Sequence, residues 1–195
     1  MSKGEETRQF IIEKAAPLFN RKGMEATAMS DIMEITRLSK GSLYVHFRDK
    51  DELTKAVVEY NLQLLEKKVT TAIQQAPTAK AKLFAFIDVL ANATKPPVEG
   101  GCPMINFGME ADDTNPLIKQ RIHQAIEQSQ KTIATIIRAG IKAGEFNPDW
   151  NYKEFATIMF ATIEGGVFIS RIAGNNEKMK IIAGHLKKMI EEQLV

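Results

Sequence analysis

The sequence has little of several features that would assign it to other classes of protein. Its 195 residues include one cysteine, which excludes an internal disulfide framework and fits a reducing compartment. No apolar run approaches the roughly 18 residues that a membrane span needs, and the opening Met-Ser-Lys-Gly-Glu-Glu lacks the apolar core of a secretory signal. We therefore expect a cytoplasmic protein that does not enter a membrane. The net charge of +2 is small, so any attraction to nucleic acid must come from a local patch.

Motifs of known enzyme classes are also missing. The sequence has no glycine-rich phosphate loop, no nucleophile elbow and no pair of closely spaced cysteines. Its three histidines, His46, His123 and His185, do not have the spacing of metal ligands. These absences predict a protein that is not an enzyme and that holds no metal and no cofactor.

Apolar residues recur with a helical period along almost the whole chain, and no segment alternates as a strand does. Gly23 follows the first apolar stripe and is placed to end a helix. The last two helices are expected at about 151–172 and 176–193. We predict an all-α protein of about nine helices. A small three-helix unit would occupy residues 1–50, and a larger helical body would occupy residues 51–195.

The segment 27–53 is the most informative part of the sequence, because it predicts two short helices joined by a tight turn and followed at once by a long helix. The second short helix has four polar or charged side chains, Lys40, Ser42, Tyr44 and His46. Only three apolar side chains are available to anchor it, Leu43, Val45 and Phe47. A helix so short and polar is poorly suited to core packing. It is suited to lying in a DNA groove, as the recognition helix of a helix-turn-helix does.

This pattern resembles the tetracycline-repressor-type (TetR) transcriptional regulators over Arg8 to Leu53. The matching positions are Ile12, Ala15, Ala16, Leu18, Phe19, Gly23, Thr27, Asp31, Ile32, Ser39, Lys40, Gly41, Leu43, Tyr44, His46, Phe47, Lys50 and Leu53. The body resembles that family only in the number and length of its helices. The resemblance implies an all-helical homodimer with two DNA-reading heads and one ligand or signal cavity in each subunit.

The resemblance and the residue chemistry together predict a set of DNA contacts. They are Thr27, Arg37, Ser39, Lys40, Gly41, Ser42, Tyr44, His46 and Lys50. Ser39 can cap the recognition helix, whose free N-terminal amides favour a phosphate. Lys40 and Ser42 lie on its first turn and are the candidates for contact with base edges. The family residues that correspond to Tyr44 and His46 bind phosphate oxygens.

Two positions depart from the family pattern. Arg37 stands where the turn usually has glycine, and a side chain in a left-handed conformation costs about 1–2 kcal/mol. Ala28 stands where a hydroxyl residue usually caps the second helix, and loss of that cap costs about 1 kcal/mol unless Thr27 replaces it. These departures are the only support for an alternative function, a helical protein-binding module with a degenerate DNA head.

Cys102 is the most distinctive residue of the body, because it lies in a Gly-Gly-Cys-Pro loop that leads into a short helix. In the family this short helix often relays ligand binding, and some members with a similar Gly-Cys motif sense oxidants or electrophiles. A helix N-terminus favours the reactive thiolate, whereas a lone cysteine is also often a small buried apolar residue. Both interpretations stay open. The remaining candidates for ligand contact supply aromatic, thioether or branched apolar surface: Phe84, Met104, Phe107, Met159, Phe160 and Ile163.

The last two helices are the predicted dimer interface, because helix 151–172 is apolar almost all round. The predicted interface residues are Gly165, Gly166, Met179, Ile182, Leu186, Met189 and Ile190. A two-fold dimer would place its recognition helices about 34 Å apart and prefer a palindromic operator in double-stranded DNA. The sequence therefore predicts a DNA-binding transcriptional regulator, a repressor that a small-molecule or an oxidant or electrophile signal releases from its operator.

Overall fold

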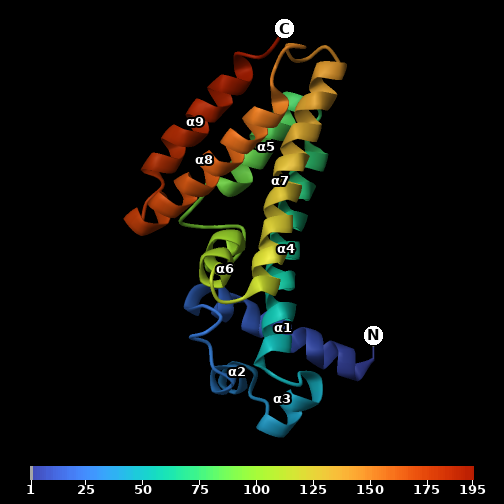
Figure 1. Ribbon diagram of the computed structural model, residues 1–195, viewed down its shortest axis with the longest axis vertical. Helices are drawn as coiled ribbons and strands as arrows, with labels where there is room; N and C mark the ends of the chain where they lie inside the picture. The colour runs from blue at the N-terminus through green and yellow to red at the C-terminus, as the bar shows by residue number, and fades with distance from the viewer. Residues whose placement is uncertain (1) are drawn as a thin grey trace. The chain divides into compact units, whose positions relative to one another are not determined.

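The structure is a computed structural model, and it describes residues 2–195. Over this range the chain is all-α, with no strand beyond a single bridge between Phe146 and Leu194. In chain order the helices are α1 Lys3–Lys22, α2 Met29–Thr36, α3 Lys40–His46, α4 Lys50–Gln75, α5 Ala79–Leu90, α6 Pro103–Ala111, α7 Pro116–Lys142, α8 Tyr152–Ala173 and α9 Glu177–Glu191 (Figure 1). The predicted fold class and the predicted number of helices are confirmed for the described residues.

The helices fall into two compact units. One contains the chain up to Leu64 together with Val98–Ile122, and the other contains Leu65–Pro97 and His123–Val195. The long helices α4 and α7 each contribute to both units. Helix α6 therefore shares a unit with the helix-turn-helix, although the sequence suggested that it belongs to the body. The functional boundary near residue 50 remains a prediction.

The first unit is built around α1. Its apolar stripe buries Ile11, Ala15 and Phe19, and α2 and α6 both pack against this helix (Figure 1). Helix α1 ends at Gly23, whose φ of 96° is a conformation that residues with a Cβ rarely adopt. The chain then turns into the short α2 and α3, so the position of the helix-turn-helix depends on how this turn is held.

In the second unit α8 packs against α9, and both also contact α5. Gly166 permits the close approach, because a Cβ there would lie 2.7 Å from the sulfur of Met179 and 2.8 Å from Cδ1 of Ile182. Leu186 and Ile190 are buried within the chain in the same way. The sequence predicted contacts with a partner subunit for these residues, whereas Gly166, Met179, Leu186 and Ile190 make contacts within the chain. Their role in a dimer interface stays a prediction.

Helix α8 is long and apolar enough to cross a membrane by length and composition, contrary to the expectation from the sequence. Eight of its residues, among them Phe155, Met159 and Ile163, are buried in the protein core. A core helix of a soluble protein passes the same test of length and composition. The apolar character of α8 is explained by this packing on one side and by an exposed apolar strip on the other, described below.

Candidate nucleic-acid interface

The turn between α2 and α3 contains the one described non-glycine residue with a positive φ, Arg37, at φ 58° and ψ 25°. Arg37 therefore adopts the left-handed conformation that glycine usually supplies at this position. Its side chain is exposed, so the strain of about 1–2 kcal/mol is not relieved by burial. Arg37 instead places a cation at the surface beside the start of α3, where a phosphate would be favoured.

The N-terminus of α2 is held without a side-chain cap. Ala28 occupies the N-cap position, and its amide donates to the Asp31 carboxylate at 2.8 Å. Lys22 forms an ion pair with the same carboxylate, and this hydrogen bond with Lys22 lowers the pKa of Asp31. Thr27 does not replace the missing cap: it is fully buried, and its hydroxyl donates to the Gly23 carbonyl at 2.6 Å. The structure thus gives the Thr27 side chain a structural role and not the DNA-facing one that the sequence suggested.

Helix α3 presents its polar side to solvent. Ser39 is its N-cap, and its hydroxyl oxygen accepts from the amide of Ser42 at 3.2 Å, as predicted. Leu43 and Phe47 are fully buried and anchor the helix. The third predicted anchor is wrong, because Val45 is 80% exposed. An apolar side chain exposed on a recognition helix can contact the methyl group of thymine in the major groove.

The predicted DNA contacts apart from Thr27 belong to α3, to the turn before it or to the first residue of α4. Five are exposed, namely Arg37, Ser39, Lys40, Gly41 and Tyr44, and three are half-buried, namely Ser42, His46 and Lys50. The ammonium of Lys40 lies 5.9 Å from the centroid of the Tyr44 ring, so the two side chains form one polar and cationic surface. The ammonium of Lys50 is partly engaged, since it donates to the Glu25 carbonyl at 2.9 Å.

The junction between α3 and α4 is fixed by a small charged network. Asp49 accepts from the amide of Glu52 at 2.8 Å, as expected of a cap. The Glu52 carboxylate accepts from the amide of Arg48 at 3.0 Å and from the guanidinium of Arg8 at 3.1 Å, and these two contacts lower the pKa of Glu52. Arg8 also lies 4.4 Å above the ring of Phe47. The C-terminal end of α3 is thereby tied to α1.

The turn after α1 is bound to α6 by two side chains that sequence reasoning did not identify. The carboxylate of Glu110 accepts from the amides of Met24 at 2.7 Å and Glu25 at 2.6 Å. One helical turn earlier, the amide of Asn106 donates to the carbonyl of Asn20 at 2.8 Å and to the carbonyl of Gly100 at 3.0 Å. We call these contacts of Asn106 and Glu110 the α6 clamp.

Asn20 completes the α6 clamp from the side of α1. It is 2% exposed, and its amide nitrogen donates to the carbonyls of Glu99 at 2.8 Å and Gly101 at 3.0 Å. Gly100 has a φ of 97°, and a Cβ there would lie 2.9 Å from the Asn20 backbone. The spacing of Asn106 and Glu110 places both on one face of α6, but no pattern in the sequence indicates that this face meets α1.

Comparison with known proteins decides the class of this fold. Residues 11–57 match the family model of bacterial regulatory proteins of the tetR family, and residues 79–186 match the tetracyclin repressor-like C-terminal domain. The chain belongs to the TetR family. It shares 35% identity with a TetR-family transcriptional regulator from Cytophaga hutchinsonii over 100% of this chain and 98% of that one, with a TM-score of 0.94. A TetR regulator from Chloroflexus aurantiacus gives the same values.

A curated relative supports the same assignment. The transcriptional repressor DhaR of Mycobacterium sp. (strain GP1) is 23% identical over 177 residues, which cover 88% of this chain and 86% of DhaR. The chain is therefore a DNA-binding transcriptional regulator. Its family is one of regulators and not of enzymes.

In this TetR-family protein the predicted ligand contacts are divided between the two units. Met104 and Phe107 lie on α6 in the first unit and are buried. The other four belong to the second unit, where Met159, Phe160 and Ile163 are buried on α8. Phe84 is half-buried between the ammonium groups of Lys80, at 5.3 Å, and Lys187, at 5.1 Å, from its ring centroid. Their role in ligand binding remains a prediction.

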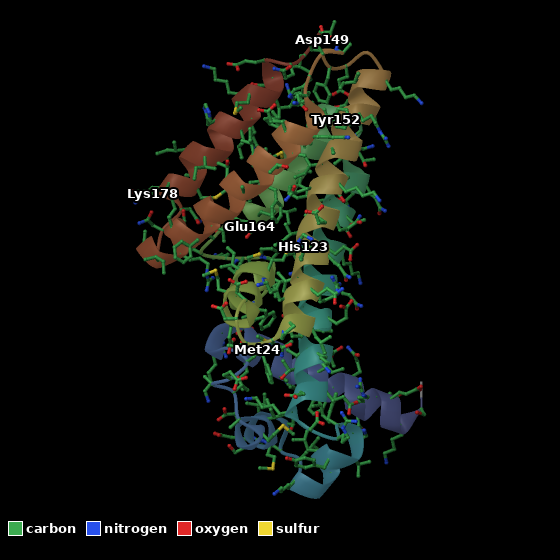
Figure 2. The ribbon with its side chains drawn as sticks, in the orientation of Figure 1. Met24, His123, Asp149, Tyr152, Glu164 and Lys178 are labelled. Atoms are coloured by element: carbon green, nitrogen blue, oxygen red, sulfur yellow. The ribbon has the colours of Figure 1, made fainter. Side chains whose placement is uncertain are left out.

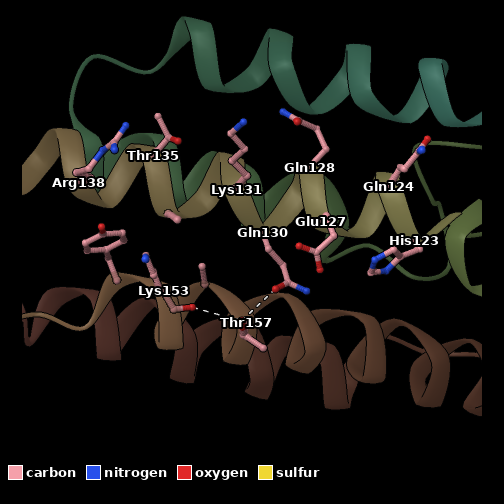
Figure 3. A pocket seen from close by; sticks show the side chains of 13 residues that line it. His123, Gln124, Glu127, Gln128, Gln130, Lys131, Thr135, Arg138, Lys153 and Thr157 are labelled. Carbon is pink, nitrogen blue, oxygen red and sulfur yellow. Dashed lines mark hydrogen bonds between the residues drawn. The ribbon is translucent and has the colours of Figure 1, made fainter. Parts of the chain in front are cut away.

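The structure instead shows a pocket of about 680 Å³ between α7 and α8, which we call the α7–α8 pocket (Figure 3). It is lined by His123, Gln124, Glu127, Gln128, Gln130, Lys131, Ala134, Thr135, Arg138, Tyr152, Lys153, Ala156 and Thr157. None of the predicted ligand contacts lines it. The sequence-based prediction relied on aromatic, methionine and branched apolar side chains. It did not consider the amide, hydroxyl and cationic side chains that follow one another along one face of α7.

Proposed function

We propose that this protein is a homodimeric, cytoplasmic repressor that binds a palindromic operator and leaves it when a small molecule binds the helical body. The observation that carries DNA reading is the exposed surface of α3, with a capped N-terminus and a cation at Lys40. An N-terminus of this kind favours a phosphate, while the first-turn side chains reach base edges. The alternative of a degenerate head loses support, because Arg37 adopts the turn conformation and Asp31 holds the start of α2.

The exposed apolar strip of α8 and α9 supports a dimer interface. Its large side chains are Ile158, Phe168, Ile169, Ile172 and Ile181. Ile172 is 77% exposed and Ile181 is 72% exposed, which is unusual for isoleucine. Gly165 lies on the same side of α8 with no atom near the position of a Cβ, so a second helix can approach there. We therefore keep α8 and α9 as the dimer helices but assign the contact to their outer sides.

The α6 clamp supports a route by which α6 controls the head. Glu110 holds the two amides that follow α1, and Lys50 of α4 holds the carbonyl of the same Glu25. A shift of α6 must therefore break these hydrogen bonds or move the turn that leads into α2. We infer that the signal acts by changing the position of α6, which favours a state that does not bind DNA.

Between the two kinds of signal, burial favours a small molecule over an oxidant. Cys102 is the N-cap of α6 and is 7% exposed, and oxidation of a thiol requires access as well as thiolate character. The proposed function therefore assigns Cys102 a structural position at the start of α6.

Fluorescence anisotropy with DNA from upstream of the protein's own gene tests the proposal, with excess random DNA as competitor. We expect saturable binding that survives the competitor and weakens with salt at a log–log slope of about −0.9 for each phosphate neutralised. Lys40→Gln should reduce this slope, whereas Lys67→Gln, at an exposed position on α4, should not. A folded protein that fails to bind at low salt, or whose binding the competitor abolishes, would refute sequence-specific DNA binding.

A further inference from the structure

The α7–α8 pocket has the charge pattern of an anion-binding site. Three cationic side chains line it, Lys131 and Arg138 from α7 and Lys153 from α8, against one carboxylate, Glu127. Among residues 2–195, none of these four forms an ion pair within 4.0 Å. This contrasts with Lys80, Lys119 and Lys187, which all pair with nearby carboxylates.

The charges are separated along the pocket. Figure 3 shows Arg138 and Lys153 toward one end and Glu127 and His123 toward the other, with Lys131 between them. Glu127 and Arg138 are 11 residues apart on one helix, which corresponds to about 16 Å along its axis. Because the carboxylate lies far from Arg138, it does not neutralise the cationic end.

The rest of the lining suits an organic molecule better than a bare ion. Ala134 of α7 contributes apolar surface, and Tyr152 of α8 contributes an aromatic ring. The hydroxyl of Thr157 donates to the side-chain oxygen of Gln130 at 3.0 Å, so the two helices are joined across the pocket. The volume of about 680 Å³ lies within the range typical of small-molecule sites.

We propose that the α7–α8 pocket binds an amphipathic organic anion, a carboxylate with an apolar chain. Its carboxylate would lie at the end that contains Arg138 and Lys153, and its chain would run along Ala134. Binding of this anion does not depend on DNA recognition, but its action as the inducing signal rests on the proposed function. The site is formed by the second unit alone, and none of the buried apolar residues predicted for ligand contact takes part.

Isothermal titration of the full-length protein with octanoate, in the absence of DNA, tests this proposal. The matched probes are 1-octanol and octyltrimethylammonium, which keep the chain and change the charge of the head. We expect one octanoate to bind per chain, with an affinity at least about tenfold higher than that of either matched probe. Arg138→Gln and Lys153→Gln should each weaken octanoate binding by about five- to tenfold.

Lys142→Gln is the matched control, since Lys142 is an exposed lysine on α7 outside the pocket. Circular dichroism would establish that all three variants are folded. Equal affinity for octanol and octanoate, equal effects of Arg138→Gln and Lys142→Gln, or no binding of octanoate at millimolar concentration would each overturn the proposal. If octanoate binds as expected but does not displace DNA, the site is supported and only its role as the signal in the proposed function fails.

Discussion

Glu110 is the residue whose replacement tests the α6 clamp most sharply. Its carboxylate accepts from two consecutive amides, at 2.7 Å from Met24 and 2.6 Å from Glu25. Glutamine at position 110 keeps the length of the side chain and one carbonyl oxygen, but it turns an NH₂ group toward the second amide. Met24 is 4% exposed, so water does not readily replace a lost partner of its amide, whereas Glu25 is exposed. The loss of folding free energy caused by Glu110→Gln should therefore be larger than for an exposed unsatisfied donor and smaller than for a fully buried one.

We expect Glu110→Gln to lower the free energy of unfolding by about 1–3 kcal/mol. For a chain of this size that corresponds to a fall in Tm of about 3–10 °C. Thermal unfolding followed by circular dichroism measures the shift, with Glu66→Gln, at an exposed position on α4, as the control. Hydrogen exchange supplies a local readout, because the amides of Met24 and Glu25 should exchange faster while the amides of α1 should not. An unchanged Tm together with unchanged protection of these two amides would refute the reasoning.

Four other predictions follow from the geometry. Replacement of an operator thymine by deoxyuracil removes the methyl group that Val45 would contact, so it should weaken DNA binding by the wild type about fivefold at that base in an anisotropy titration. DNA binding by Val45→Ala should not change on the same replacement. Gly166→Ala should destabilise the chain by about 1–3 kcal/mol in chemical denaturation, whereas Gly165→Ala should leave the fold intact and weaken the dimer in analytical ultracentrifugation. Cys102→Ser should bind DNA as the wild type does, and peroxide should release neither. The pKa of Asp31 is lowered in the folded state, so its ionised carboxylate stabilises the fold above its ordinary pKa near 4, and this stabilisation is lost as the pH falls below that value. Denaturation midpoints of wild type and Asp31→Asn, compared between pH 3 and 7, measure this loss.

Local sequence chemistry was sufficient to predict the head. The cap at Ser39 and the two short helices before a long one each depend on residues within a few positions of one another, and the structure contains them. The exposure of Val45 could not be predicted with the same certainty. A helix as short as α3 has only about two turns, so an apolar residue between Leu43 and Phe47 does not reveal its face by periodicity.

Contacts between distant segments were not predictable from one sequence. Helical periodicity shows that Met179, Leu186 and Ile190 share an apolar face, but it does not say whether that face meets the same chain or a partner. Glu110 lies 86 residues from Met24, with which it forms a hydrogen bond. The α7–α8 pocket was missed for a related reason, since its polar lining resembles an ordinary solvated helix face until α8 is placed beside it.

DNase footprinting of the DNA upstream of the gene tests the central claim, that this chain reads DNA as a two-fold dimer. The account predicts two protected half-sites related by a palindrome, with centres about 10–10.5 base pairs apart or a multiple of that distance. Both half-sites should be lost together when one is scrambled. A single protected half-site that is unaffected by scrambling its neighbour, or the absence of any footprint at concentrations that saturate anisotropy, would contradict it.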